Sequence, residues 1–233
     1  MNAIDELLDT IFDGQKPALY PEFEGWVRGS RRYKAFASTY RDKIRTKLRN
    51  VRDEAGLKDV RAELETAARL LHDERFTLEY EKYAASKQRG PDFTVTFRTH
   101  TPFNVEVRRI RFLELDEGDT EAQISKVMAV LCDKVGQMPS GIINLLWLIA
   151  ERELSEADLT RAVTTLRQLA ERKTEAFFTR RGFESAAAFL KQYRQLGAIV
   201  LHQSGENVIW LNSLAQRKTL PEIVNALKRL ETI

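Results

Sequence analysis

The feature that most constrains the fold is a change of hydrophobic period in the middle of the chain. Up to about residue 73, apolar residues recur at helical spacing, but in three short segments they alternate with polar residues: 76–80, 93–97 and 103–107. Alternation with a period of two is typical of strands with one buried face. The connections between these segments are too short for a crossover helix, so we predict three consecutive antiparallel strands.

Helical patterns flank the three predicted strands. A helix is predicted over residues 58–73, and another begins at Thr120, where Thr120 and Gln123 form a capping-box pattern. The apolar run from Ile142 to Ile149 is typical of a strand that is covered on both faces in the centre of a sheet. The order helix, three strands, helix, strand predicts a mixed α/β fold.

Further elements are predicted toward both ends of the chain. Before the first strand we expect helices over 4–13 and 31–50, and after the central strand we expect a helix from Ser155, a helix over 184–196, strands over 198–202 and 208–212, and a helix capped at Thr219. We therefore predict an N-terminal helical extension, residues 1–57, and an α/β domain, residues 58–233.

The composition fits a globular protein with a large core. Of the 233 residues, 43% are hydrophobic and 30% are charged. No apolar run approaches the roughly 18 residues that a membrane helix needs. The single cysteine, Cys132, excludes internal disulfides and favours a reducing compartment, and the acidic first residues do not resemble a signal peptide. We expect a cytoplasmic protein that does not contact a membrane.

The second and third predicted strands form a hairpin that gathers charged side chains. If Phe97 pairs with Phe103, the apolar rows of the two strands meet, which is the usual criterion for correct register. Asp92 then falls opposite Arg108 and diagonal to Glu106, with about 7 to 8 Å between backbones. Two converging carboxylates supply the hard oxygen ligands that Mg²⁺ or Mn²⁺ prefers, so the hairpin predicts a divalent metal site.

The residues of this hairpin also resemble a known nuclease motif. Pro91-Asp92 is followed, after thirteen residues, by Glu106-Val107-Arg108. This pattern, within residues 58–150, resembles the PD-(D/E)xK nuclease superfamily of restriction-endonuclease-like enzymes, whose core order is helix, three strands, helix, strand. The resemblance implies that Asp92 and Glu106 ligate the metal and that the backbone carbonyl of Val107 is a further ligand.

The resemblance assigns roles to three more side chains. Gln123 stands where many relatives have a glutamine that contacts the substrate or the active site, and Glu63 stands where some relatives contribute another acid. Arg108 occupies the position of the family's lysine. Because an arginine stays protonated, Arg108 could stabilise negative charge on the phosphate but could not serve as a base. Lys82 and Lys126 are candidates to replace the lysine.

A basic block precedes the predicted domain. Between Arg28 and Arg61 the chain carries twelve Lys and Arg residues against four acidic ones, which is the pattern of a surface that faces nucleic acid. The alternative is a solvated helix face. The residues that we expect to contact the nucleic-acid backbone are Arg31, Arg32, Lys34, Arg41, Arg45 and Arg49.

Each candidate site residue also has a purely structural interpretation. Asp92 could be a turn residue or could form a cross-strand ion pair with Arg108. Gln123 is explained by the capping box, and Glu63 could be an acid on a helix surface.

The function expected from these residues is Mg²⁺- or Mn²⁺-dependent hydrolysis of phosphodiester bonds in DNA, ahead of RNA. One alternative is an inactive nuclease fold that binds nucleic acid or a protein, with Arg108 as the residue that favours it. Another is a protein–protein scaffold whose basic helix docks on an acidic partner. A homodimer is compatible with each function.

Overall fold

The computed structural model describes residues 2–83, 90–112 and 119–230. Its strands form one six-stranded sheet in the order β1-β2-β3-β4-β5-β6. β1, β2 and β3 are antiparallel, β4 runs parallel to β3 and β5, and β6 is antiparallel to β5. The strands are β1 (Phe76–Tyr80), β2 (Phe93–Phe97), β3 (Thr101–Ile110), β4 (Ile143–Ala150), β5 (Leu196–Gln203) and β6 (Glu206–Leu211). The helices are α1 (Ala3–Phe12), α2 (Tyr20–Gly29), α3 (Arg31–Thr39), α4 (Arg41–Asn50), α5 (Glu54–His72), α6 (Thr120–Val135), α7 (Glu156–Glu171), α8 (Glu175–Thr179), α9 (Ala186–Tyr193) and α10 (Pro221–Lys228).

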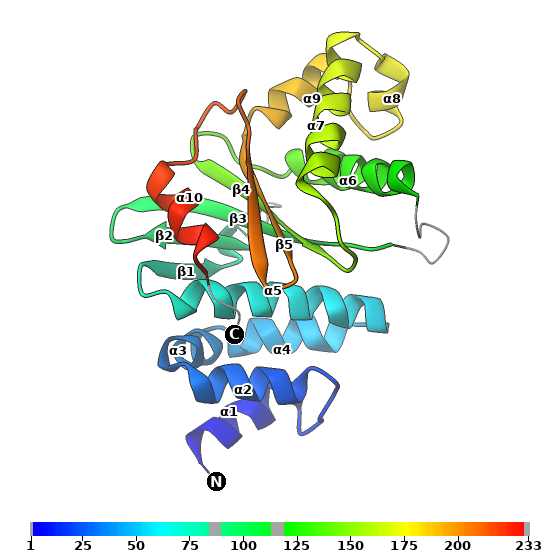
Figure 1. Ribbon diagram of the computed structural model, residues 1–233. Coiled ribbons are helices and arrows are strands. Elements are labelled where there is room, and N and C mark those ends of the chain that lie inside the picture. The colour runs from blue at the N-terminus through cyan, green and yellow to red at the C-terminus, as the bar shows by residue number, and fades with distance from the viewer. Residues whose placement is uncertain (1, 84–89, 113–118, 231–233) are drawn as a thin grey trace.

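Helices cover both faces of the sheet (Figure 1). On one face α5 packs against β1 and β3, and α1–α4 stack beyond it. On the other face α6 packs against β3 and is followed by α7 and α9. Successive side chains of a strand point to opposite faces, so Val105 and Val107 join the core beneath α5 while Ile110 joins the core beneath α6.

The structure confirms the mixed α/β class and the order of the central elements. A helix, α5, precedes three antiparallel strands, and α6 then leads into β4. β4 lies in the interior of the sheet as predicted, with Leu146, Trp147 and Leu148 fully buried. None of the described helices is both long enough and apolar enough to span a membrane.

The predicted hairpin register is wrong by two residues. Phe93 pairs with Val105 and Phe97 pairs with Thr101, so the ladder extends closer to the turn than expected. The chain reverses within Arg98–His100, because Arg98 adopts a left-handed φ of 56°. Continuing this register by one pair brings Asp92 level with Glu106 rather than with Arg108.

Several predicted helix boundaries are also wrong. The helix expected over 31–50 is divided at Tyr40 into α3 and α4. A further helix, α2, occupies a segment that was expected to be a loop. Pro21 does not prevent this helix, because it stands in the first turn, where proline is tolerated. α6 is capped by Asp119, which accepts the N–H of Ala122 at 3.0 Å, so the capping box predicted for Gln123 is not formed. The domain boundary expected at residue 57 falls inside α5.

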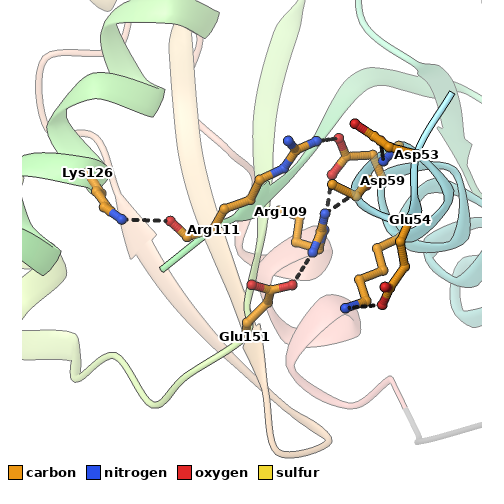
Figure 2. A network of polar contacts seen from close by, with 10 residues as sticks. Asp53, Glu54, Asp59, Arg109, Arg111, Lys126 and Glu151 are labelled. Atoms are coloured by element: carbon orange, nitrogen blue, oxygen red, sulfur yellow. Dashed lines mark hydrogen bonds and ion pairs between the residues drawn. The ribbon is translucent and has the colours of Figure 1, made fainter. Parts of the chain in front are cut away.

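A buried arginine joins α5 to the ends of β3 and β4 (Figure 2). The Arg109 side chain, 6% exposed, donates to Asp59 at 3.0 Å and to the Ala55 carbonyl at 2.8 Å, and it pairs with Glu151 after β4. Arg111 pairs with the same Asp59, but its side chain is 46% exposed. Arg109 therefore fixes the start of α5 against the sheet, while Arg111 adds a contact at the surface.

Replacing Arg109 should cost much more stability than replacing Arg111. Arg109→Met leaves Asp59 and Glu151 without their buried partner, and we expect a loss of about 3 kcal/mol in the free energy of unfolding. The matched change Arg111→Met removes an exposed pair and should cost less than about 1 kcal/mol. Urea denaturation of both variants measures the difference, and equal losses would contradict the structural role given to Arg109.

Candidate active site

Asp92 and Glu106 approach each other at one end of β2 and β3. Asp92 lies directly before β2, and its Oδ2 accepts the backbone N–H of Val107 at 2.8 Å. Glu106 lies within β3 and is 5% exposed. The Asp92 carboxylate therefore lies beside the backbone of Glu106 and Val107, and the N–H of Val107 and not Arg108 is the group that contacts it.

A lysine from α4 lies among three carboxylates. The ammonium of Lys47 pairs with Glu63 of α5, lies 3.0 Å from Oε1 of Glu81, and lies 3.9 Å from Oδ1 of Asp92. The hydroxyl of Tyr80 donates to Glu63 at 3.0 Å. Lys47 thus joins α4 to α5, to the end of β1 and to the start of β2.

Glu81 reaches this cluster through an unusual backbone conformation. Its φ is 47°, in the left-handed region that most side chains avoid, and its N–H donates to the carbonyl of Asp92 at 2.7 Å. The ammonium of Lys43 binds the carbonyls of Tyr80 and Glu81 at 2.9 and 3.2 Å. Strained residues concentrate at functional sites, and here the strain lies beside the carboxylates.

A second lysine holds Glu106 from the other face of the sheet. Lys134, near the end of α6, places its ammonium 2.8 Å from Oε1 of Glu106. The two side chains are only 12% and 6% exposed. Glu106 is therefore oriented by a buried ion pair, while Asp92 is oriented by a backbone N–H.

Burial and mutual repulsion shift the titration of the cluster. Burial raises the pKa of Asp92 well above its usual range, and the nearby carboxylates of Glu63 and Glu106 raise it further against the opposing effect of Lys47. Burial also raises the pKa of Glu106, although Lys134 opposes this shift. The pKa of Lys47 is raised, because the attraction of Glu63, Tyr80 and Asp92 outweighs the effect of burial.

The cluster lies beside an opening at the protein surface. Lys47 and Glu81 help to line a hollow of about 400 Å³, together with Asp42, Lys43 and other residues of α4. The Asp92 side chain is 16% exposed and that of Lys47 is 24% exposed. A ligand could therefore approach the carboxylates along α4.

The other residues predicted for the site lie apart from these contacts. Arg108 is half-buried and, in the described part of the chain, its side chain makes no hydrogen bond or ion pair. Gln123 is half-buried near the start of α6, and its side chain makes no hydrogen bond within the described residues. Of the two lysines expected to replace the family's lysine, Lys82 pairs with Glu79, and Lys126 binds the carbonyl of Arg111 (Figure 2).

The six predicted nucleic-acid residues divide into two groups. Arg32 donates to three backbone carbonyls at the end of α5 and in β1, while Arg45 and Arg49 both pair with Asp13. Arg31, Lys34 and Arg41 form no close ion pair among the described residues, and only Arg41 approaches a carboxylate, that of Asp42 at 3.9 Å. The second group presents the charges that a polyanion could contact.

Lys47, Lys134 and Glu81 were not among the predicted site residues. Lys47 follows Lys43 by one helical turn and lies between the apolar Ile44 and Leu48, a position that can turn a cation inward. Lys134 stands among the buried Leu131 and Val135 near the end of α6. These neighbours were a usable signal for Lys47, but its carboxylate partners lie on other elements.

The carboxylates are the type of ligand that a divalent cation prefers, but they are not arranged around a common point. Within residues 2–83, 90–112 and 119–230, no three His, Cys, Asp or Glu side chains are grouped so that one ion could contact them all. Four carboxylates nevertheless share two ammonium groups in direct contact, Lys47 and Lys134. The cluster is therefore rich in the oxygen donors that Mg²⁺ and Mn²⁺ prefer, and when all four carboxylates are ionised their charges outnumber the two ammonium charges.

The raised pKa of Asp92 predicts a particular pH dependence of stability. Between the unfolded-state pKa of Asp92, about 4, and its raised folded-state pKa, the folded protein binds more protons, so stability is lost as pH rises. Asp92→Asn keeps an acceptor for the Val107 N–H, and its stability advantage over the wild type should grow with pH across this window. Urea denaturation from pH 4 to 8 measures it.

The exposed Asp9 provides the control for this experiment. Asp9→Asn should stay within about 0.5 kcal/mol of the wild type at every pH, as surface substitutions usually do. If the difference between Asp92→Asn and the wild type does not change with pH, the electrostatic description of the cluster is wrong.

Comparison with known proteins adds no assignment to this site. No protein-family model, curated protein or solved structure matches the chain. The function therefore has to be inferred from the residues of the site and their contacts.

Proposed function

We propose that the protein hydrolyses phosphodiester bonds in nucleic acid, DNA ahead of RNA, with Mg²⁺ or Mn²⁺ as cofactor. The observation that carries this proposal is the approach of Asp92 and Glu106 on adjacent strands, with Lys47 and Glu63 beside them. A restriction-endonuclease-like core has the same order of elements as α5, β1, β2, β3, α6 and β4. This order supports the proposal together with the carboxylates.

Asp92 and Glu106 would hold the metal ion, with the carbonyl of Val107 or the carboxylate of Glu63 as further ligands. When bound, the ion would lower the pKa of a water molecule and polarise the phosphate. The excess of carboxylates over ammonium groups in the cluster favours such an ion, because partly buried negative charges need compensation.

The protein's own residues would position the reacting groups. The N–H of Val107 and the ammonium of Lys134 fix the orientation of Asp92 and Glu106. Lys47 supplies a positive charge beside Asp92, where charge on a phosphate would grow during hydrolysis. Arg108, with no protein partner in the described residues, is available to the substrate instead. We therefore propose that Lys47 of α4 takes the role of the lysine in the nuclease motif.

A second function is favoured by the same ion pairs. Lys47 and Lys134 already neutralise part of the carboxylate cluster, and Arg108 replaces the family's lysine. In a nuclease fold that binds nucleic acid without cleaving it, the carboxylates could remain paired with the protein's own lysines. Metal binding distinguishes the two functions.

Titration with Mn²⁺ tests the proposed enzyme. Calorimetry should show that the wild type binds Mn²⁺. Asp92→Asn and Glu106→Gln should each weaken this binding by more than the roughly 10- to 100-fold that is typical when only a residue behind a metal ligand is replaced. Both variants should lose metal-dependent cleavage of labelled DNA. Lys47→Met should bind Mn²⁺ at least as well as the wild type, because it removes a competing cation, but should cleave more slowly.

The control is Asp9→Asn, which should match the wild type in both assays. If the wild type binds Mn²⁺ and cleaves, and the two site variants do not, the enzyme is supported. Salt-sensitive DNA binding without Mn²⁺ binding would favour the second function, a nuclease fold that binds nucleic acid without cleaving it. Cleavage that survives both substitutions would overturn the proposed site.

Nucleic-acid binding should depend on the unpaired basic residues of α3. The logarithm of the binding constant should fall linearly with the logarithm of salt concentration, because phosphate contacts release counterions. Lys34→Glu should reduce the magnitude of this slope by about 1 or more. Lys191→Glu, the same change at an exposed position of α9, is the matched control. Equal slopes for both variants would place the interface elsewhere.

A further inference from the structure

The strand β6 lies at an edge of the sheet, and one side of its backbone is unpaired. β6 pairs with β5 in continuous register, and Asn212, directly after β6, donates its N–H to the carbonyl of Gly197 near the start of β5. Because backbone groups alternate between the two sides of a strand, the N–H and C=O groups of Asn207, Ile209 and Leu211 point away from β5. These backbone groups form no hydrogen bond with the described residues.

The opposite edge of the sheet, at β1, is covered by basic side chains. The N–H of Glu81 points toward β2, so the carbonyls of Phe76 and Tyr80 point outward. Arg32 binds the carbonyl of Phe76, and Lys43 binds that of Tyr80 at 2.9 Å. Natural sheets protect their edges with such cover against pairing with another chain. Within the described structure no cation covers β6 in this way, so β6 is the edge that can accept a further strand.

The C-terminal end of β6 is exposed and apolar. Leu211 is 50% exposed and Leu220, directly before α10, is 39% exposed, and these two are the exposed large hydrophobic side chains of the described residues. α10 packs against β6, and the carbonyl of Leu227 near its end accepts a hydrogen bond from the Asn207 side chain at 2.7 Å. α10 therefore runs back along β6, with Leu220 toward the end of the strand and Leu227 toward its start.

A hollow of about 470 Å³ lies at the other end of β6. It is lined by residues 205–209 of the β5–β6 hairpin, by Glu156, and by residues 228–230 at and after the end of α10. The side chains of Asn207 and Leu211 lie on the same face of β6, because successive side chains of a strand alternate. The hollow beside Asn207 and the exposed Leu211 therefore lie on one face of the strand, at its opposite ends.

Two copies of β6 can pair about a two-fold axis that passes beside Ile209, perpendicular to the sheet. In antiparallel pairing centred there, Ile209 pairs with its own copy and Asn207 pairs with Leu211 of the second molecule. All three outward residues then form hydrogen-bonded pairs. Side chains of directly paired residues lie next to each other, so each Leu211 reaches the hollow beside Asn207 of the other molecule.

The charges at the ends of β6 are complementary under this symmetry. Glu206, at the start of β6, falls level with Asn212 of the second molecule. Lys218 lies next to that position, since its ammonium binds the carbonyl of Ser213 at 2.6 Å. Glu206 and Lys218 are exposed and form no ion pair with the described residues, so each is available to the other molecule.

The charges of α10 are complementary as well. Glu222 stands in the first turn of α10, while Lys228 and Arg229 stand at its end. All three are exposed and form no ion pair with the described residues. Because the axis places the two copies of α10 antiparallel on the same face of the sheet, Glu222 of each molecule faces the basic end of α10 in the other.

We propose that the protein forms a homodimer in which the β6 strands of two molecules pair antiparallel about Ile209, so that one sheet continues through both. The partner is a second copy because the exposed leucine, the hollow and the charges of this surface fit the same surface on another molecule. This interface is independent of the proposed nuclease function.

Sedimentation equilibrium of the full chain tests the dimer. Between about 1 and 100 μM the wild type should show a reversible monomer–dimer equilibrium, because dimerisation depends on protomer concentration. Leu211→Lys places a charge in the pairing edge and should raise the dissociation constant at least about tenfold. Thr77→Lys adds the same charge at an exposed position of β1 and should dimerise like the wild type. A wild type that stays monomeric over this range, or equal dissociation constants for the two variants, would overturn the proposal.

A charge exchange tests the symmetry of the interface. Glu222→Arg alone and Arg229→Glu alone should each dimerise more weakly than the wild type, because like charges then face each other at both ends of the interface. A mixture of the two variants has opposite charges at both ends and should form a heterodimer with nearly wild-type affinity. Sedimentation of one variant, fluorescently labelled, with an excess of the other measures this affinity. A mixture that associates no better than either variant alone would show that another surface joins the molecules, which contradicts the proposal.

Discussion

The arrangement of the N-terminal half depends on the ammonium of Lys47. It contacts carboxylates from α5, from the end of β1 and from the start of β2, so one side chain of α4 joins three other elements. Such a contact is stable only while all partners are present, because a buried charge that loses its partner is costly. Lys47 therefore ties α4 to α5 and to the sheet.

The same contact explains why the site combines attraction with repulsion. Glu63 and Glu106 both raise the pKa of Asp92, while Lys47 and the N–H of Val107 oppose the shift. Neighbouring carboxylates with perturbed titration are typical of catalytic sites, although structural ion pairs produce them as well. The two functions proposed for this fold differ in whether Lys47 shares the cluster with a metal ion or replaces it.

The sequence predicted the central elements because their patterns are local. Alternation in β1 and β2 and the apolar run of β4 identify strands from a few neighbouring residues. The approach of Asp92 and Glu106 was also predicted, since a register error of two residues keeps every side chain on the same face. The error mattered only for Arg108, which was expected opposite Asp92.

What the sequence did not predict depends on contacts between distant elements. Lys47 and Lys134 reach the carboxylates from helices on opposite faces of the sheet, and no spacing in the chain links them to β2 or β3. The division of residues 31–50 at Tyr40 depends on a change of helix direction that hydrophobic period does not report. Asp119 replaced Thr120 as the cap of α6 because both residue types suit that position.

The stacking of α1–α4 beyond α5 has a consequence for how the protein is made. These helices leave the ribosome before the strands, yet Lys47 can complete its contacts only after residues 81 and 92 have been synthesised. Until β1 and β2 pair, Phe36 of α3 also lacks the rings of Tyr80 and Phe93 that it contacts in the folded protein. Synthesis of β1 and of the start of β2 is therefore needed before α3 and α4 can complete their contacts with the sheet.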